Sequence, residues 1–394
     1  MNNAPKLKFK SFTTPWFRTQ LGDITSFKSG NTPSKNNSNF WRGEYPWISA
    51  SSMYGHSFGS SEHTLTKEGL KAAKVAEKGT LLLLVRGSML FNKVPVGIAS
   101  RKVAFNQDVK AINTHEVTSS RFLLLWFLAQ ENRLLNMVTG TGIGAGKLDT
   151  DELKGLSFVY PKDRKEQQRI VDFLTTIDIK TSQLTEKHRL LKEYKKGVMQ
   201  QVFSQQIRFK DDGKAYPDWK TEALGKYLEP YKELVPANTD LPILTSSRTG
   251  LYLQERSVIN EGEYGVLPLG YFTYRHMSDD LIFKFNVNRD YERGAVSKEY
   301  PVFKTVEMDT YFLETKLNEG HEFKRFAIQQ KQGGTRTRLY FKNLKELKLS
   351  LPCLAEQQKI AQFLQSIDSK IDLVAEQIEQ TKQFKKGLLQ QMFV

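Results

Sequence analysis

The chain has 394 residues, of which 39% are hydrophobic and 11% aromatic, enough to build two or three folded domains. A formal net charge of +15 and an isoelectric point of about 9.5 indicate an anionic partner, such as DNA, RNA or a membrane surface. The longest apolar runs, 81–85 and 122–129, are too short to cross a bilayer, and the N-terminus lacks the apolar core of a secretory signal.

The first predicted elements lie in a block that follows a short leading segment. The run LLLLV at 81–85 predicts a buried strand, and the Gly-Ser after Arg86 predicts a turn that would expose this arginine. The run FLLLWFLA at 122–129 predicts a buried helix. The first block is therefore expected to be a mixed α and β domain.

The next feature is TGTGIGAGKL at 139–148, which suggests a phosphate-binding loop. The P-loop pattern requires glycine where Thr141 stands and a hydroxyl residue where Leu148 stands, so two working parts are missing. The dinucleotide pattern G-x-G-x-x-G fails as well. We expect a flexible loop, although a nucleotide-dependent enzyme built around residues 139–148 stays open as an alternative function.

Two long helices are predicted next in chain order, over 166–203 and 356–393. Apolar residues recur in each at seven-residue spacing, which is typical of a coiled-coil seam. The seam positions are Ile170, Ile177, Leu184, Leu191 and Val198 in the first helix, and Ile360, Ile367, Val374 and Leu388 in the second. A helix of about 35 residues is roughly 50 Å long. Lys-Lys-Gly at 195–197 and 385–387 interrupts both seams, and we expect a close-packing or bending role for the glycine.

The two helices are copies of one sequence. They align without a gap at an offset of 190, with 17 of 38 positions identical. The repeat extends to 148–161 and 339–352 before the helices, and the segment 206–226 matches 6–23. No convincing match joins 24–138 to 227–330. The chain is therefore a tandem duplication in circular order, in which one scaffold carries two different inserts.

These features resemble the specificity subunit of type I restriction–modification systems. The strongest motifs are LSLPCLAEQQKI at 349–360 and PKDRKEQQRI at 161–170, and the strand pair at 79–99 and 104–112 is similar to that of target-recognition domains. The resemblance implies a non-catalytic subunit whose two recognition domains each read half of an asymmetric, bipartite DNA target. It also implies that the helices set the spacer and dock two copies of a modification subunit that methylates adenine.

The resemblance also predicts the architecture. We expect an α+β protein with two globular target-recognition domains separated by two long antiparallel coiled-coil helices, with pseudo-two-fold symmetry. The predicted segments are 1–160 for the first domain, 161–205 for the first helix, 206–351 for the second domain and 352–394 for the second helix. S-adenosylmethionine, ATP and magnesium are expected in partner subunits, including restriction subunits, and no cofactor or metal in this chain.

Residues that could contact DNA are basic or small polar side chains in the two inserts, because arginine and amide groups read base edges and cations bind phosphates. The candidates in the first half are Ser49, Ser51, Ser52, Arg86, Ser88, Asn92, Lys93, Arg101, Lys102, Gly142 and Lys147. The candidates in the second half are Ser246, Ser247, Arg248, Tyr274, Arg275, His276, Arg336 and Arg338. The alternating string TRTR at 335–338 would place both arginines on one face of a strand.

The remaining observations limit the alternatives. The lone Cys353 cannot form an internal disulfide, which suits the cytoplasm, and no methyltransferase tetrapeptide, helicase P-loop or nuclease core is found in the sequence. The lysines of the first helix could simply be solvated. A basic coiled-coil scaffold with general nucleic-acid binding therefore stays open beside the sequence-specific reader.

Overall fold

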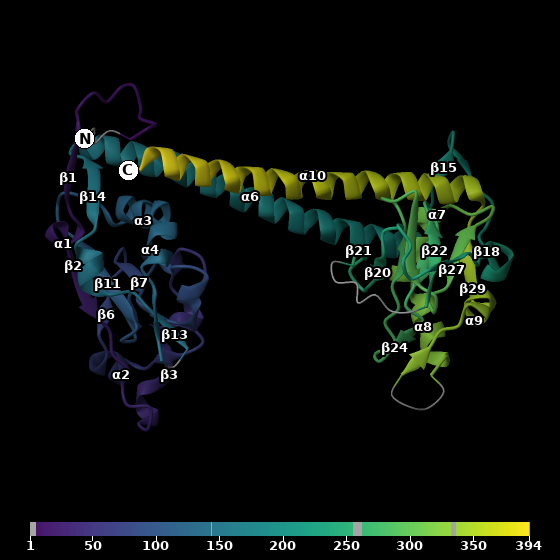
Figure 1. The fold of residues 1–394 in the computed structure, drawn as a ribbon, viewed down its shortest axis with the longest axis horizontal. Coiled ribbons are helices and arrows are strands. Elements are labelled where there is room, and N and C mark those ends of the chain that lie inside the picture. The colour runs from purple at the N-terminus through teal and green to yellow at the C-terminus, as the bar shows by residue number, and fades with distance from the viewer. Residues whose placement is uncertain (1–4, 143, 255–261, 332–335, 394) are drawn as a thin grey trace. The chain divides into compact units, whose positions relative to one another are not determined.

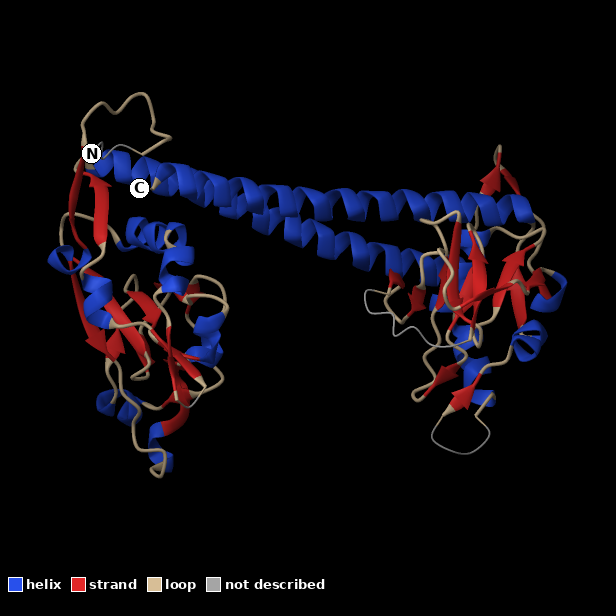
Figure 2. Cartoon of the chain, in the orientation of Figure 1, coloured by secondary structure: helices blue, strands red, loops and turns tan. Residues whose placement is uncertain are grey.

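The computed structural model describes residues 5–142, 144–254, 262–331 and 336–393 (Figure 1). Contacts divide the chain into two compact units. Unit 1 comprises Met1–Glu186 with Ala375–Val394, and unit 2 comprises Lys187–Val374. The predicted α+β class, with two β-containing blocks and two long helices, is confirmed (Figure 2).

Helices α6 (Arg164–Phe203) and α10 (Leu354–Met392) each contribute to both units. In unit 1, Lys385 near the end of α10 lies 2.6 Å from Asp178 in the first half of α6. In unit 2, Lys195 lies 2.6 Å from Asp368 by the equivalent contact. Within each unit the two helical segments therefore run antiparallel. The division by contacts assigns one part of each helix to unit 1 and the other part to unit 2.

The predicted seam positions lie inside the two units. Ile170, Ile177 and Leu388 belong to the hydrophobic core of unit 1, and Val198, Ile360 and Ile367 to that of unit 2. Leu184 and Val374 are also buried, whereas Leu191 is only partly buried. Each heptad stripe thus packs on the core of unit 1 over one part of its helix and on the core of unit 2 over the other part. Among the described residues, no helix has a stretch both long and apolar enough to span a membrane.

Unit 1 is built on a sheet of order β2-β11-β7-β9-β4. Its strands are β2 (Thr25–Ser29), β11 (Val109–Thr114), β7 (Leu81–Leu84), β9 (Val96–Ala99) and β4 (Ser57–Phe58). The four leucines of β7 are fully buried, as expected for a strand covered on both faces. Helices α3 (Ser120–Ala129) and α4 (Glu131–Asn136) follow β11, and side chains of α3 such as Phe122 join the same core.

Unit 2 repeats this frame, with a sheet of order β18-β27-β23-β25. Its strands are β18 (Leu228–Tyr231), β27 (Val302–Thr305), β23 (Phe272–Tyr274) and β25 (Phe285–Val287). The helices α7 (Thr310–Glu319) and α8 (His321–Gln329) follow β27 as α3 and α4 follow β11. The duplication therefore extends into the inserts, where the sequence comparison found no match.

The units differ in a second sheet. In unit 1 its order is β5-β3-β10-β6, with β5 (Thr64–Leu65), β3 (Trp41–Ile48), β10 (Val103–Phe105) and β6 (Val75–Ala76), and β3 runs parallel to β10. In unit 2 its order is β19-β22-β26, with β19 (Leu234–Pro236), β22 (Glu263–Pro268) and β26 (Arg293–Ser297), all antiparallel. A shared frame thus carries two different additions.

A strand pair before each long helix joins the leading segment to the rest of its unit. In unit 1, β1 (Trp16–Gln20) pairs with β14 (Ser157–Pro161). In unit 2, β17 (Lys220–Ala223) pairs with β29 (Lys348–Leu351). The circular order of the repeat follows from this pairing, because the segment that opens each unit is a partner of the strand that precedes its helix.

A buried glutamate at the start of each long helix completes this junction. Glu356 is fully buried and accepts hydrogen bonds from Arg208 Nε at 2.8 Å, Arg208 Nη2 at 2.9 Å and Trp219 Nε1 at 3.1 Å. Glu166 is also fully buried and accepts from Trp16 Nε1 at 2.9 Å, but Lys8 Nζ is 3.7 Å away. The Oε2 atom of Glu166 has no hydrogen-bond partner among the described residues.

The buried carboxylates of the two junctions therefore differ in how many hydrogen bonds and how close a countercharge they have. Replacing Glu356 with glutamine should remove the closest countercharge of the Arg208 guanidinium, with Asp218 left at 3.8 Å, and destabilise unit 2 by about 3 kcal/mol, since breaking a buried pair is costly. The matched change Glu166→Gln should alter stability by no more than about 1 kcal/mol, because Lys8 is weakly engaged. Hydrogen exchange in the first turns of α6 and α10 would separate the two effects in the full-length chain.

The pH dependence of the free energy of unfolding supplies a further check on the Glu166 variant. Burial raises the pKa of Glu166 above its ordinary value of 4.5, with Trp16 and Lys8 opposing the shift. The folded state then binds this proton more tightly than the unfolded state, so wild-type stability falls as pH rises from 4.5 through the raised pKa. Glu166→Gln should therefore gain stability relative to wild type as the pH rises above 4.5, and a constant difference would contradict the assignment.

Candidate nucleic-acid interface

The glycine-rich stretch of unit 1 forms a β-hairpin instead of the flexible loop predicted from sequence. Strands β12 (Thr139–Thr141) and β13 (Ala145–Lys147) pair with each other, and β13 also pairs with β8 (Arg86–Gly87). Lys147 lies directly opposite Arg86 in this register. Two candidate cations, separated by 61 positions in sequence, thus become neighbours. Gly142 is exposed in the turn at the other end of the hairpin, and Ile143 lies outside the described residues.

The serine candidates of unit 1 lie next to this hairpin. Ser49 precedes the short 3₁₀ helix η2 (Ala50–Ser52), and the Ser52 hydroxyl donates to the Ser49 carbonyl at 3.0 Å. A Cβ atom placed on Gly87 would lie 3.8 Å from Cβ of Ala50, so η2 packs beside β8. The exposed side chains of Ser51, Arg86, Ser88 and Lys147 therefore gather at one edge of unit 1, which we call the β8–β13 surface.

Four other candidates in unit 1 are exposed, and two of them contact neighbouring side chains. The Lys102 ammonium lies 2.8 Å from a carboxylate oxygen of Glu77, and the Lys93 ammonium lies 5.3 Å from the centre of the Tyr54 ring. Asn92 and Arg101 are exposed as well. Surface ion pairs are weak, so Lys102 can exchange Glu77 for a phosphate at small cost.

Two candidates in unit 2 are corrected by their burial. Tyr274 is fully buried in β23 and donates its hydroxyl to the Leu339 carbonyl at 3.1 Å. Ser246, at the end of β20 (Leu244–Ser246), is buried and accepts a hydrogen bond from the Asn286 amide at 2.8 Å. The prediction that both side chains are exposed is wrong, because inward and outward positions are hard to tell apart by alternation in strands of three residues. Neither side chain can reach a ligand, and we remove both from the proposed contacts.

The arginines of unit 2 gather around a short strand pair. Strands β24 (Met277–Ser278) and β28 (Thr337–Arg338) are antiparallel, and Thr337 is buried between the exposed Arg336 and Arg338. The remaining residue of the TRTR string, Thr335, lies outside the described residues. We call this strand pair, together with the exposed Arg248, Arg275, Arg336 and Arg338, the β24–β28 surface.

Carboxylates neutralise part of the β24–β28 surface. Arg248 makes hydrogen bonds of 2.8 and 2.7 Å to Asp280, and Arg336 makes one of 3.0 Å to Asp279. Arg275 is exposed, and Ser247 is partly buried in the turn after β20. His276 is half-buried, stacks on Tyr340 at 6.3 Å between ring centres, and has its pKa lowered by burial.

The two surfaces occupy equivalent places in the duplicated frame. Lys147 faces Arg86 in unit 1, and Arg338 faces Met277 in unit 2. Both pairs are related by the same offset of 191 positions. A basic residue at this position is therefore shared by β13 of unit 1 and β28 of unit 2, whereas its cross-strand neighbour differs.

Sequence reasoning missed a depression of about 860 Å³ beside η2 in unit 1. Its lining includes Ser49 and Ser51 together with Trp41, Arg42, Trp47 and Glu62. The two indole rings are 5.4 Å apart in an edge-to-face arrangement. The Trp-Arg-Gly string at 41–43 was the available signal, because it combines an aromatic ring, a cation and a residue with backbone freedom.

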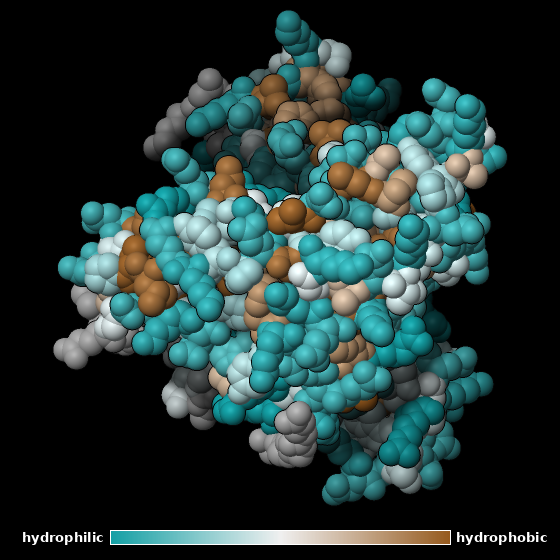
Figure 3. All heavy atoms as spheres, turned by 90° about the vertical axis from the view of Figure 1, so that its right-hand side faces the viewer, coloured by the Kyte–Doolittle hydropathy of each residue, from teal (hydrophilic) through white to brown (hydrophobic). Residues whose placement is uncertain are grey.

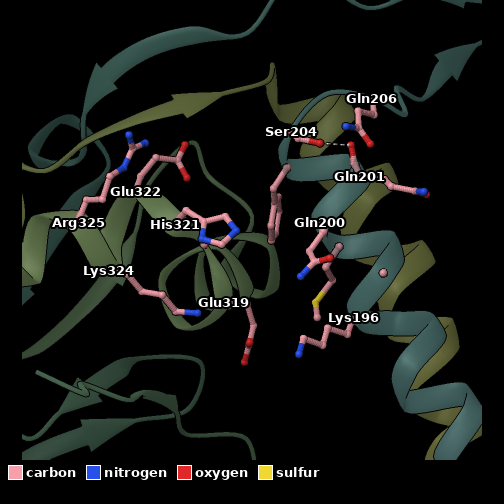
Figure 4. Close-up of a pocket in the computed structure, with 14 residues that line it drawn as sticks. Lys196, Gln200, Gln201, Ser204, Gln206, Glu319, His321, Glu322, Lys324 and Arg325 are labelled. Carbon is pink, nitrogen blue, oxygen red and sulfur yellow. Dashed lines mark hydrogen bonds between the residues drawn. The ribbon is translucent and has the colours of Figure 1, made fainter. Parts of the chain in front are cut away.

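A second depression, of about 740 Å³, lies in unit 2 between α6 and α8 (Figure 4). Lys196 and Gln200 of α6 line one side, and His321 and Lys324 of α8 line the other. Behind it, the fully buried Lys316 pairs with Glu322 at 2.8 Å, and burial lowers the pKa of this lysine. The mixed charges of this site set it apart from the basic candidate surfaces.

The glycine of each Lys-Lys-Gly string lacks the close packing that we expected. A Cβ atom placed on Gly197 or Gly387 would meet no atom within 4 Å, and both helices continue through the glycine. Each glycine instead borders open space, and Gly197 lines the depression in Figure 4.

The molecular surface favours polar partners. On the face shown in Figure 3, hydrophilic side chains predominate and hydrophobic ones lie in small separate patches. In the part of the chain that the structure describes, no group of three or more His, Cys, Asp or Glu residues could hold a metal ion.

Comparison with known proteins identifies similar chains. A family model for the type I restriction modification DNA specificity domain matches residues 14–192 and 295–383. The EcoR124I/EcoR124II specificity subunit of Escherichia coli is 31% identical over 183 residues, which span 46% of this chain and 45% of that protein. The MjaIX specificity subunit of Methanocaldococcus jannaschii is 22% identical over 95% of this chain and 91% of its own length.

Solved structures show the same fold. The S subunit of a type I restriction–modification system from M. genitalium has a TM-score of 0.56 at 14% identity, covering 99% of both chains. A chain from a study of complex assembly and conformational transition of the type I system has a TM-score of 0.55 at 15% identity, covering 96% of this chain and 98% of its own.

The β8–β13 surface makes a prediction about salt dependence. The double variant Arg86→Ala, Lys147→Ala should weaken binding to random duplex DNA and reduce the slope of log K against log salt by about 2, since each phosphate contact contributes about 0.9. The control Lys154→Ala removes an exposed lysine paired with Asp151 at 2.8 Å and should leave the slope unchanged. An effect of Lys154→Ala half as large as that of the double variant would show that only net charge matters.

Proposed function

Because the chain belongs to the type I restriction–modification DNA specificity family, we propose that it is the non-catalytic subunit that reads a bipartite, asymmetric DNA target. One observation carries this proposal: the same frame occurs twice, and each copy bears a different second sheet and a different edge beside its basic strand. Two identical readers would suit a palindrome, whereas two different readers suit two unlike half-sites.

The assignment of roles follows from this arrangement. The β8–β13 surface of unit 1 reads one half-site and the β24–β28 surface of unit 2 reads the other. The exposed candidates divide into base readers, chiefly arginines, and phosphate contacts such as Lys93, Lys102 and Lys147. The helices α6 and α10 join the two readers and set the unread spacer.

Partner docking is proposed on the repeated part of the helices. Lys195 and Lys385 are engaged in ion pairs within their units, but the following Lys196-Gly197 and Lys386-Gly387 border open space. A helix glycine costs about 1 kcal/mol relative to alanine, so its recurrence without internal packing points to an external contact. Equivalent surfaces in the two units suit two copies of one modification subunit. Methylation of adenine from S-adenosylmethionine, and cleavage that uses ATP and magnesium, would then belong to partner subunits.

The direct test is selection from a random duplex library by the full-length chain with its modification subunit. We expect enrichment of two unlike half-sites at a fixed spacing. Binding that falls steeply with salt and enriches no motif would favour the general nucleic-acid scaffold instead. ATP-dependent turnover by the isolated chain that is lost in Lys147→Ala would favour the nucleotide-dependent enzyme.

The spacer role makes a separate prediction. Insertion of one heptad into both helices, after Glu186 and after Val374, lengthens each by about 10 Å, or roughly three base-pair steps. The preferred spacer should change while both half-sites are retained. Insertion into α6 alone is the control, because it shifts one seam against the other and should abolish selection. Changed half-sites with an unchanged spacer would overturn the assigned roles.

A further inference from the structure

Arg42 has a backbone conformation that its side chain does not favour. It lies in the left-handed region with φ of 67°, where a residue with a Cβ atom is strained. The strand β3 is irregular here, since both Trp41 and Tyr45 pair with Leu65 of β5. Such bulges re-aim a side chain, and they are common beside functional sites.

Contacts on both sides hold this strained conformation. A Cβ atom on Gly43 would lie 2.4 Å from the Leu65 carbonyl oxygen, so only glycine fits next to Arg42. On the other side, the Phe40 carbonyl accepts a hydrogen bond of 3.0 Å from the Thr66 amide. The fold therefore imposes this backbone conformation, and the conformation sets the direction of the Arg42 side chain.

The Arg42 side chain is exposed at the depression beside η2. Within the described residues, no hydrogen bond or ion pair engages its guanidinium, nor the carboxylate of Glu62 on the same depression. The indole N–H groups of Trp41 and Trp47 already donate to the carbonyls of Ser34 and Asn31, at 3.0 and 3.1 Å. The rings thus supply apolar walls, and Arg42 and Glu62 supply the free donor and acceptor.

The position of Arg42 in the frame gives a second, independent argument. Strand β3 belongs to the sheet β5-β3-β10-β6, whereas unit 2 carries a differently arranged sheet. A residue that reads only one of two unlike half-sites can lie in a part that the two units do not share, as Arg42 does. Lys147, by contrast, has a basic counterpart in Arg338 at the equivalent position of unit 2.

We infer that Arg42 is a specificity-determining residue of unit 1 and reads the guanine of a G·C pair in the major groove, with Glu62 facing the cytosine. Guanine presents two acceptors, O6 and N7, which match the two donors of a guanidinium fork, and cytosine presents the N4 amino donor, which matches a carboxylate. An A·T pair offers a different order of donor and acceptor. This inference rests on the proposed function, because it adds the depression beside η2, which shares Ser51 with the β8–β13 surface, to the reader of the first half-site.

The variant Arg42→Gly tests the inference without damage to the fold. Glycine adopts positive φ freely, so the variant should melt at or above the wild-type temperature. With the full-length chain and its modification subunit, library selection should show discrimination for G·C at one position reduced by about 5- to 150-fold, which corresponds to one lost bidentate contact. The other half-site should be unchanged, and Arg338→Ala identifies that half-site by altering it.

Matched controls separate base reading from charge. Lys35→Ala removes an exposed cation from the same depression and should weaken binding to all sequences alike. Glu62→Gln should reduce discrimination at the same position as Arg42→Gly, and by less. If wild type selects a bipartite motif and Arg42→Gly selects the same one, the inference is wrong and the proposed function stands. If wild type selects no motif, the proposed function itself fails.

Discussion

The architecture depends on the junction at the start of each long helix, where a buried glutamate meets the segment that opens the unit. Glu166 and Glu356 are each fully buried and tie the helix to a tryptophan and a cation of the segment that opens the unit. A carboxylate without such partners could not be buried, because its desolvation is costly. The leading strand, the strand before the helix and the helix itself must therefore assemble together. This requirement explains why the repeated parts recur in circular order.

The glutamine that follows each glutamate extends this junction. The Gln167 side chain donates to the Pro161 carbonyl at 2.9 Å, and Gln357 donates to the Pro352 carbonyl at 3.0 Å. The same side chains accept from the start of the helix that follows the sheet, through Thr118 in unit 1 and the Asp309 amide in unit 2. The Glu-Gln pair that opens each helix is thus a structural motif, which ties the helix to the strand before it and to the start of the helix that follows the sheet.

Sequence analysis predicted the parts whose side chains are constrained by this junction and by the seams, namely the helices, the segments before them and the circular order. It missed the shared sheet frame, since β-ladders are held by backbone hydrogen bonds and tolerate any buried apolar set. The buried leucines of β7 and the Phe272-Thr273-Tyr274 run of β23 fill equivalent places with little likeness.

The same reasoning explains the fate of the candidate site residues. Arg86 and Lys147 were found because a turn and a glycine run exposed them, and only the strand register shows that they are neighbours. Tyr274 and Ser246 were misplaced because in strands of three residues the inward and outward positions differ by one step. Arg42 was missed because its exposure depends on a bulge, which arises from pairing with Leu65 and has no local periodicity.

The division between frame and addition has a consequence for how such a reader can change. The frame carries the buried charges and the long seams, where substitutions are costly, and it presents one basic strand near each helix. The second sheet is attached to the frame but contributes none of the junction contacts. Residues such as Arg42 and Glu62 are exposed and unpaired, so their replacement costs the fold little. Specificity can therefore vary at the edge of a unit while the junction, the helices and the spacing stay constant.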